Sequence, residues 1–305
     1  MIVNKYYKPL LILFLVTVIS FPVQASLNFG ILPDDASIPL IVAREKGLFK
    51  ETGYDINLVP FNTAIERDSA LQVGEIDGTV ADIVAAAFAV DNGKKLKITS
   101  RANGRFTMLA APDSGISSYE ELKNAKIAIS SNTVIEYLTD KFFEKNGYDY
   151  SNLKKVAIPK IPVRVQMLAA SKVQAATMPE PLASLAVSKG AKIIETTNEL
   201  GGAPIIIMFT QQAIDDKPQE VQAFYEAYNK AVNLVNENHE DYRDLIVNKG
   251  RFPASVKNAF EFSEYEEAHL PTKSMLVEVM EWMKDNNLLT SNLDYNELVT
   301  DQFVE

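Results

Sequence analysis

Four acidic side chains stand where predicted strands give way to helices. Asp34 and Asp35 follow the strand predicted at 27–31, Asp82 follows the strand predicted at 76–80, and Glu180 follows the strand predicted at 173–177. Ligands of open α/β sheets bind outside the carboxyl ends of the strands. Carboxylates there can accept hydrogen bonds from a ligand, or each can simply cap the helix that follows, which contributes about 1 kcal/mol.

Glu180 lies between two prolines in the stretch TMPEPLA, residues 177–183. A residue that precedes proline is kept out of the helical region, so Met178 and Glu180 should both be extended. Pro181 suits the first position of the helix predicted up to Ser188. The Glu180 carboxylate is therefore held with little freedom, either as a helix cap alone or as an acceptor that faces a ligand.

Hydroxyl and amide side chains occupy the equivalent loops. The strand-to-helix connections carry Ser37, then Asn62 and Thr63, and in the second half of the chain Ser131, Asn132 and Thr133. Glu66, three residues after Thr63, predicts a capping box. These residues are common helix caps, and a helix start also offers backbone N–H groups to an anionic or strongly polar ligand.

Two further kinds of side chain bear on the nature of a ligand. Arginines that could reach these loops, and would favour an anion, are Arg67, Arg101, Arg105 and Arg164. Each could equally be a surface or ion-pair arginine. Aromatic residues near the loops that could stack on a flat ring, or belong only to the core, are Phe61, Phe106 and Tyr137.

The sequence offers few means of catalysis. It has no cysteine for a nucleophile, a disulfide or a thiolate metal site. Its two histidines, His239 and His269, fall in predicted C-terminal helices, away from the adjacent Ser130 and Ser131. No glycine-rich phosphate loop of the dinucleotide or Walker type is present. We expect no catalytic residues, no metal and no cofactor.

Strands and helices alternate along the chain in a pattern that predicts an α/β fold. The pattern restarts near residue 113, which predicts a two-lobed protein in which each lobe is a mostly parallel sheet flanked by helices. We divide it into lobe 1 at 26–108, lobe 2 at 109–203, and a return to lobe 1 at 204–305. Helices predicted at 217–237, 240–249 and 272–286 should pack back onto lobe 1. Two crossings between the lobes would form a hinge beside a ligand cleft.

The first 25 residues resemble a cleaved secretory signal. Lys5 and Lys8 precede an uncharged apolar stretch, which ends at the small-residue site Val23-Gln24-Ala25. Removing them leaves 28 basic and 40 acidic side chains, a formal charge near −12, which disfavours nucleic acid as a partner. Without a cysteine to carry a lipid, we expect a freely diffusing, monomeric periplasmic protein.

The run VAREKGLFKETGYDINLVPFNTAIERDSALQVGEIDGTVAD at 42–82, with MPEP at 178–181, resembles the type II periplasmic binding proteins of ABC importers for thiamine precursors, taurine, sulfonates and nitrate. The tail at 219–245 is similar to the family's return helices. The resemblance implies a two-lobed receptor that closes on a small molecule and delivers it to a membrane permease. It also implies that the loop at 34–37, the helix starts at 62–63 and 131–133, Asp82 and Glu180 line the cleft.

The ligand class stays open at the level of sequence. The acids Asp34, Asp35, Asp82 and Glu180 favour a cationic or amino-bearing heterocycle, such as a thiamine pyrimidine precursor, over an anion that they would repel. The arginines and the 131–133 helix start favour the alternative, a receptor for taurine, alkylsulfonate or nitrate. An enzyme of thiamine-pyrimidine biosynthesis on the same fold, and a two-lobed sensor domain, are the alternatives from other classes.

Overall fold

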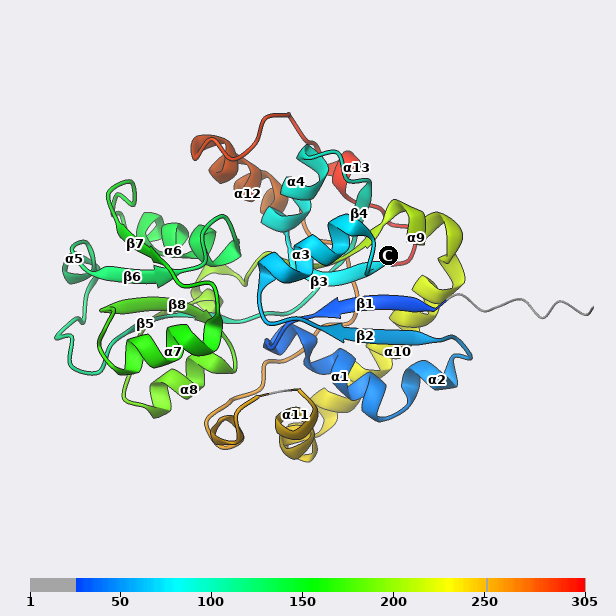
Figure 1. Ribbon diagram of the computed structural model, residues 1–305, viewed down its shortest axis with the longest axis horizontal. Helices are drawn as coiled ribbons and strands as arrows, with labels where there is room; N and C mark the ends of the chain where they lie inside the picture. Colours follow the sequence, from blue (N-terminus) through cyan, green and yellow to red (C-terminus); the bar gives the residue numbers. More distant parts are fainter. Residues whose placement is uncertain (1–25, 251, 305) are drawn as a thin grey trace, which may run out of the picture.

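The computed structural model describes residues 26–250 and 252–304 and has two lobes side by side (Figure 1). The predicted signal peptide, residues 1–25, lies outside the described residues. Each lobe is built around one five-stranded sheet, and the two sheets have the same topology. The predicted two-lobed α/β fold is confirmed.

The lobe 1 sheet has the strand order β2-β1-β3-β10-β4. Its strands are β1 (Leu27–Ile31), β2 (Ile56–Pro60), β3 (Gly78–Asp82), β4 (Leu96–Arg101) and β10 (Ile205–Thr210). β1 pairs in parallel with β2 and β3, whereas β10 runs antiparallel to both β3 and β4. Of the five strands only β10 runs opposite to the others, so the sheet is mostly parallel. β10 belongs to the part of the chain that returns from lobe 2.

The lobe 2 sheet repeats this arrangement in the order β7-β6-β8-β5-β9. Its strands are β5 (Phe106–Ala110), β6 (Lys126–Ile129), β7 (Lys154–Ala157), β8 (Ala175–Pro179) and β9 (Lys192–Thr196). β5 is the antiparallel strand, between β8 and β9. Each lobe thus receives one strand directly after a crossing. The crossings are the segments 102–105 and 197–204, the second of which includes the short helix η2 (Thr197–Leu200).

Helices cover both faces of each sheet (Figure 1). In lobe 1 they are η1 (Asp35–Ser37), α1 (Ile38–Glu45), α2 (Leu48–Glu51), α3 (Ala64–Val73) and α4 (Ile83–Asp91). In lobe 2 they are α5 (Tyr119–Leu122), α6 (Val134–Lys145), α7 (Ile161–Ala169) and α8 (Leu182–Ser188). Because most helices start directly after a strand, their N-terminal ends collect at the edge where the lobes meet.

The C-terminal part packs mainly on lobe 1. It comprises α9 (Gln211–Asp216), α10 (Pro218–Glu237), η3 (His239–Tyr242), α11 (Arg243–Lys249), η4 (Ala254–Val256), α12 (Lys273–Asp285) and α13 (Tyr295–Leu298). Phe224 of α10 meets Phe29 of β1 with ring centroids 4.4 Å apart, which fixes the return helix on the sheet. In the described part of the chain, no helix has the length and apolar character needed to cross a membrane.

Three local predictions need correction. Pro181 is the cap of α8 and not its first helical residue, so Glu180 precedes the cap. His269 lies in the irregular segment before α12, because that helix begins only at Lys273. Glu66 does accept a backbone N–H, but from Asn62 at 3.0 Å and not from the cap residue Thr63.

Candidate functional site

A cavity of about 50 Å³ lies between the lobes, and we call it the interlobe cavity. Its polar lining consists of Asp34, Thr63, Arg67 and Asp82 from lobe 1 and Ser130 and Thr133 from lobe 2. Phe106, Ile135 and Ile161 supply apolar walls. A small molecule held here would touch both lobes at once.

Three of the lining residues cap helices that start at the cavity. The Thr63 hydroxyl accepts the Glu66 amide of α3 at 3.1 Å, and Asp82 Oδ1 accepts the Ala85 amide of α4 at 2.9 Å. The Thr133 hydroxyl accepts the Ile135 amide of α6 at 3.2 Å. Helix starts are electropositive, so three of them together favour acceptor or negatively charged groups of a ligand.

Arg67 brings a positive charge into the same cavity. Its side chain is only 2% exposed, and its Nη1 donates to the Val80 carbonyl at 3.2 Å. Its Nε donates to Asp68 at 2.8 Å, whereas Nη2 lies 2.7 Å from the same carboxylate without forming a hydrogen bond. Burial lowers the pKa of Arg67, but the nearby Asp68, Asp82 and Asp34 carboxylates raise it above its ordinary value overall. The guanidinium stays charged and has donor capacity left.

Two carboxylates face this guanidinium. Burial raises the pKa of Asp34 to about 6, although hydrogen bonds from Ser37 and the charge of Arg67 oppose the shift. Burial likewise raises the pKa of Asp82 to about 6, again against the charge of Arg67. Above pH 6 the cavity therefore holds two negatively charged carboxylates, which can accept hydrogen bonds, beside one positively charged guanidinium, which can donate them.

A second polar group, Asp35, Arg105 and Glu180, joins the lobes beside the cavity. The Asp35 amide donates to the Glu180 carbonyl at 2.9 Å, and the Glu180 amide donates to the Arg105 carbonyl at 2.9 Å. Asp35 Oδ2 accepts the Arg105 amide at 2.9 Å. Burial raises the pKa of Asp35 well above its ordinary value, with the Asp34 charge adding to the shift.

Glu180 is not among the residues that line the interlobe cavity. Its Oε2 accepts the Ser184 amide of α8 at 3.0 Å, and Oε1 lies 3.6 Å from Arg105 Nη2. With Arg105 it lines a separate hollow of about 330 Å³. Burial raises the pKa of Glu180, while Ser184 and Arg105 oppose the shift.

The remaining predicted residues surround the cavity without sharing its lining. Ser37 is fully buried, and its hydroxyl donates to Asp34 at 2.8 Å. Asn62 lines an adjoining cavity of about 250 Å³. Ser131 and Asn132 are exposed. The structure thus brings Asp34, Thr63, Asp82 and Thr133 together and leaves the other predicted residues beside or behind them.

The sequence did not predict Arg67 as a ligand-binding residue. It indicated only that Arg67 is one of four arginines that could reach the cleft. Its spacing carries the missing signal: it follows the cap residue Thr63 by four positions, so both lie on one face of α3. Of the other arginines, Arg164 is buried against the carbonyls of Ile158 and Thr177. Burial lowers the pKa of Arg164 to about 9.

A family model described as the NMT1-like family matches residues 21–247. The chain belongs to the NMT1-like family. This confirms the resemblance to periplasmic binding proteins of ABC importers that residues 42–82 and 178–181 carry. No match was found among curated proteins.

Solved structures share the fold of this NMT1-like chain. The ligand-binding component of an ABC-type import system from Staphylococcus aureus, solved with zinc, has a TM-score of 0.77 and 15% identity over 92% of this chain and 98% of its own. The aliphatic sulphonate-binding protein SsuA from Escherichia coli has a TM-score of 0.77 and 16% identity over 91% and 98%. A mutant of DszB with biphenyl-2-sulfinic acid has a TM-score of 0.69 and 13% identity over 92% and 98%. At these identities the likeness shows the fold alone.

Proposed function

We propose that this NMT1-like protein is the solute-binding component of an ABC importer, which captures a small polar molecule in the interlobe cavity and delivers it to a permease. The observation that carries the proposal is the cavity itself, because its polar lining comes from both lobes. A ligand that contacts both lobes stabilises their closed arrangement, and the permease can distinguish this closed, ligand-bound form from the open form. The ABC import proteins of the same fold support this assignment.

The ligand we propose carries N–H donors next to an acceptor. Asp34 and Asp82 can accept from an amino group, and Arg67 can donate to a ring nitrogen beside it. An amino heterocycle such as the pyrimidine precursor of thiamine has this pattern, and Phe106 offers an aromatic wall for its flat ring.

A second candidate ligand is taurine, which the same charges favour. Its ammonium group would meet the carboxylates, and its sulfonate would meet Arg67 and the three helix starts. Nitrate and simple alkylsulfonates have no donor to offer Asp34 or Asp82, so they would gain nothing from the two carboxylates and be repelled by their charge. We rank them below the amino-bearing compounds.

We propose a binding protein in preference to an enzyme. Ser130 is the hydroxyl nucleophile candidate at the cavity, but neither histidine is among the residues that line it. His239 stacks on Phe262, and His269 contacts the Glu267 carbonyl in the irregular segment before α12. Without a histidine at the cavity, Ser130 lacks the usual base that activates a serine nucleophile.

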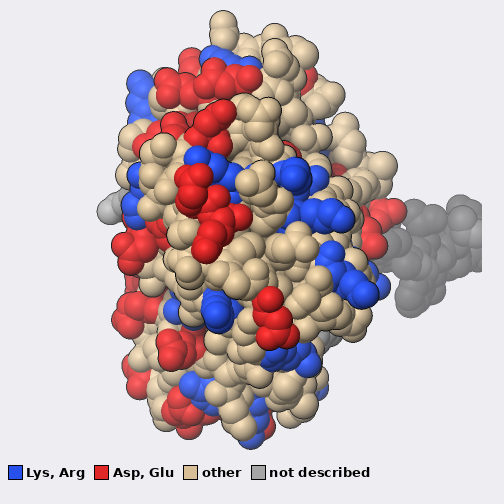
Figure 2. Space-filling view, turned by 90° about the vertical axis from the view of Figure 1, so that its left-hand side faces the viewer, with Lys and Arg blue, Asp and Glu red and all other residues tan. Residues whose placement is uncertain are grey.

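The proposed setting is the periplasm, with permease subunits as partners and a monomeric receptor. Figure 2 shows acidic and basic side chains mixed over the lobe 2 end of the molecule, so that face has no continuous basic surface for nucleic acid.

A ligand screen tests the proposal. The full chain would be exported in a bacterial host, purified from the periplasm and melted with thiamine-type aminopyrimidines, taurine, alkylsulfonates and nitrate, and binding would be confirmed by calorimetry. A ligand at about 100 times its dissociation constant stabilises the folded state by about 2.7 kcal/mol, which is a clear shift in melting temperature. A shift with amino-bearing compounds supports the proposed ligand class. A shift with nitrate or alkylsulfonate alone would contradict it.

A further inference from the structure

The side chain of Trp282 reaches from the C-terminal helix α12 to lobe 2. α12 packs against α4 of lobe 1, whereas its Trp282 indole N–H donates to Asp140 Oδ2 on α6 at 3.0 Å. The indole also meets the ring of Tyr137 edge-on, with centroids 5.4 Å apart. The indole is only 4% exposed. The lobes are therefore joined here by a buried side-chain contact, in addition to the two chain crossings.

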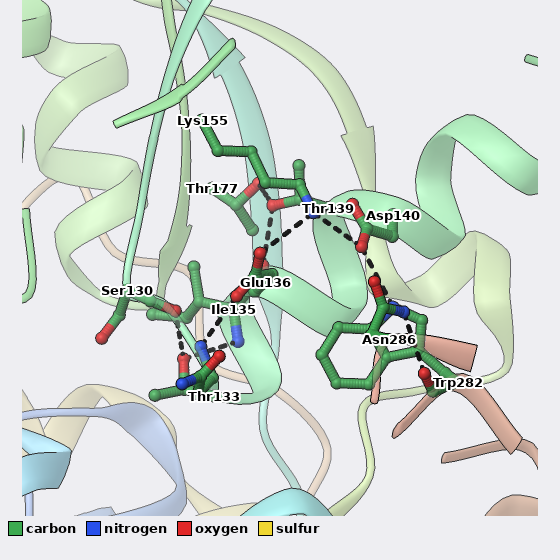
Figure 3. Close-up of polar contacts among 11 residues, drawn as sticks. Ser130, Thr133, Ile135, Glu136, Thr139, Asp140, Lys155, Thr177, Trp282 and Asn286 are labelled. Carbon is green, nitrogen blue, oxygen red and sulfur yellow. Dashed lines mark hydrogen bonds and ion pairs between the residues drawn. The ribbon is translucent and has the colours of Figure 1, made fainter. Parts of the chain in front are cut away.

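The acceptor of this hydrogen bond is held rigidly (Figure 3). Asp140 is fully buried, and Lys155 Nζ lies 2.7 Å from its Oδ1 and 2.8 Å from its Oδ2. Lys155 also donates to Glu136 Oε1 at 3.0 Å. A buried carboxylate loses favourable interactions when a donor leaves, so separating Trp282 from Asp140 costs free energy.

The same network continues to the interlobe cavity. Glu136 Oε2 accepts the backbone amide of Asn132 at 2.7 Å. Asn132 has the left-handed conformation, with a φ of 57°, so this contact supports a backbone geometry that few residues adopt. The next residue, Thr133, lines the cavity. An unbroken set of contacts thus runs from the Thr133 loop through Glu136, Lys155 and Asp140 to the indole.

We propose that Trp282 and Asp140 form an interlobe latch, which positions α6 and the 131–133 loop over the cavity when the lobes are closed. These are positioning residues, since neither lines the cavity. Their role in holding the lobes together stands on the contacts alone, whereas their role in ligand capture rests on the proposed function. Opening the lobes would remove the indole donor from Asp140 and the ring of Tyr137 from the indole.

The first variant is Trp282→Phe, which keeps an aromatic ring next to Tyr137 but removes the N–H donor and part of the buried ring volume. The matched control is Tyr295→Phe, which removes a hydroxyl that donates to the Pro271 carbonyl at 2.9 Å within the C-terminal segment. Small-angle X-ray scattering of the full exported chains without added compound should give a larger radius of gyration for Trp282→Phe than for wild type. Tyr295→Phe should match wild type. A wild-type radius for Trp282→Phe would overturn the latch.

A second variant keeps the test independent of that one substitution. Asp140→Asn retains an oxygen for the indole but loses the charge that holds Lys155, so the contact should loosen. Because Trp282 is the single tryptophan, acrylamide quenching reports on it alone, and the quenching constant should rise. An unchanged constant would count against the latch.

The two proposals fail separately. If no compound of the panel binds wild type while Trp282→Phe still widens the molecule, the proposed function fails and the latch stands. If an aminopyrimidine or taurine binds wild type, while Trp282→Phe keeps the wild-type radius and Asp140→Asn keeps the wild-type quenching constant, the function stands and the latch is wrong.

Discussion

Arg67 lies four residues after the cap residue Thr63 on helix α3, and both side chains line the interlobe cavity. The hydroxyl of Thr63 is occupied by the Glu66 amide, so it fixes the start of the helix. The Nη2 of Arg67 lies 2.7 Å from the Asp68 carboxylate and makes no hydrogen bond to any described residue. Under the proposed function, Thr63 would cap the helix and Arg67 would contact the ligand from the same helix turn.

Replacing Arg67 should separate ligand recognition from folding. Arg67→Lys keeps a positive charge but loses the planar donor pair, so we expect binding of taurine or an aminopyrimidine to weaken by about tenfold, the scale of one hydrogen bond to a charged group. Arg67→Met should weaken ligand binding further, and it also removes the ion-pair partner of Asp68. Calorimetric titration measures both effects. Equal affinity for wild type and Arg67→Met would exclude Arg67 from the site.

Asp82→Asn should make the protein more stable at pH 8. Burial raises the pKa of Asp82 to about 6, so the folded protein keeps a proton between about pH 4 and pH 6 that the unfolded chain has released. The contribution of Asp82 to stability therefore falls as the pH rises through this window. Above it, the buried charge costs as much as about 3 kcal/mol, which asparagine does not incur.

Urea unfolding at two pH values checks this sign. Asparagine remains a good N-cap, so the Ala85 amide keeps an acceptor in the variant. The unfolding midpoint of Asp82→Asn should exceed that of wild type at pH 8 and approach it at pH 4. A variant that is less stable than wild type at pH 8 would show that Asp82 is stabilised in the folded protein by its neighbours and not penalised by burial.

A substitution of Glu180 can distinguish two roles, a contact between the lobes and a hydrogen-bond acceptor for the ligand. Glu180→Gln keeps an oxygen for the Ser184 amide, so the fold should be preserved. Because the carboxylate lines the neighbouring hollow with Arg105, we expect the variant to bind the aminopyrimidine as wild type does. A loss of tenfold or more in a calorimetric titration would restore Glu180 as a ligand contact, with Glu180→Ala as the comparison for stability.

Processing of the N-terminus gives an independent check of the proposed location. Cleavage after Ala25 should leave a chain that begins at Ser26 when the full sequence is exported in a bacterial host. Intact mass spectrometry of the periplasmic fraction measures this directly. A chain that keeps residues 1–25 and stays in the cytoplasm would contradict the predicted periplasmic location.

Local sequence was sufficient for the caps and the alternation of elements. Thr63, Asp82 and Thr133 cap helices in the structure because Thr and Asp before an apolar helical run satisfy its first amides, which is a short-range effect. The regular strand and helix periods likewise predicted two α/β lobes and a returning C-terminal part.

Other features depend on contacts between distant segments. The Glu180 carboxylate is held by Arg105, which lies at the same end of the antiparallel β5–β8 pair but 75 positions away in the sequence, and by the Ser184 amide. The place of Trp282 depends on the path of residues 252–272, which contain little regular structure and so give no periodic signal.

The most direct test of the account is a paired calorimetric titration of wild type and Asp82→Asn with the aminopyrimidine precursor of thiamine at pH 7.5. The account predicts that wild type binds one molecule per chain and that Asp82→Asn binds it at least tenfold more weakly, because a charge-assisted hydrogen bond becomes a neutral one. Taurine serves as the second ligand in the same pair of experiments. Binding of neither compound to wild type, or equal binding to both proteins, would contradict a carboxylate-lined interlobe site.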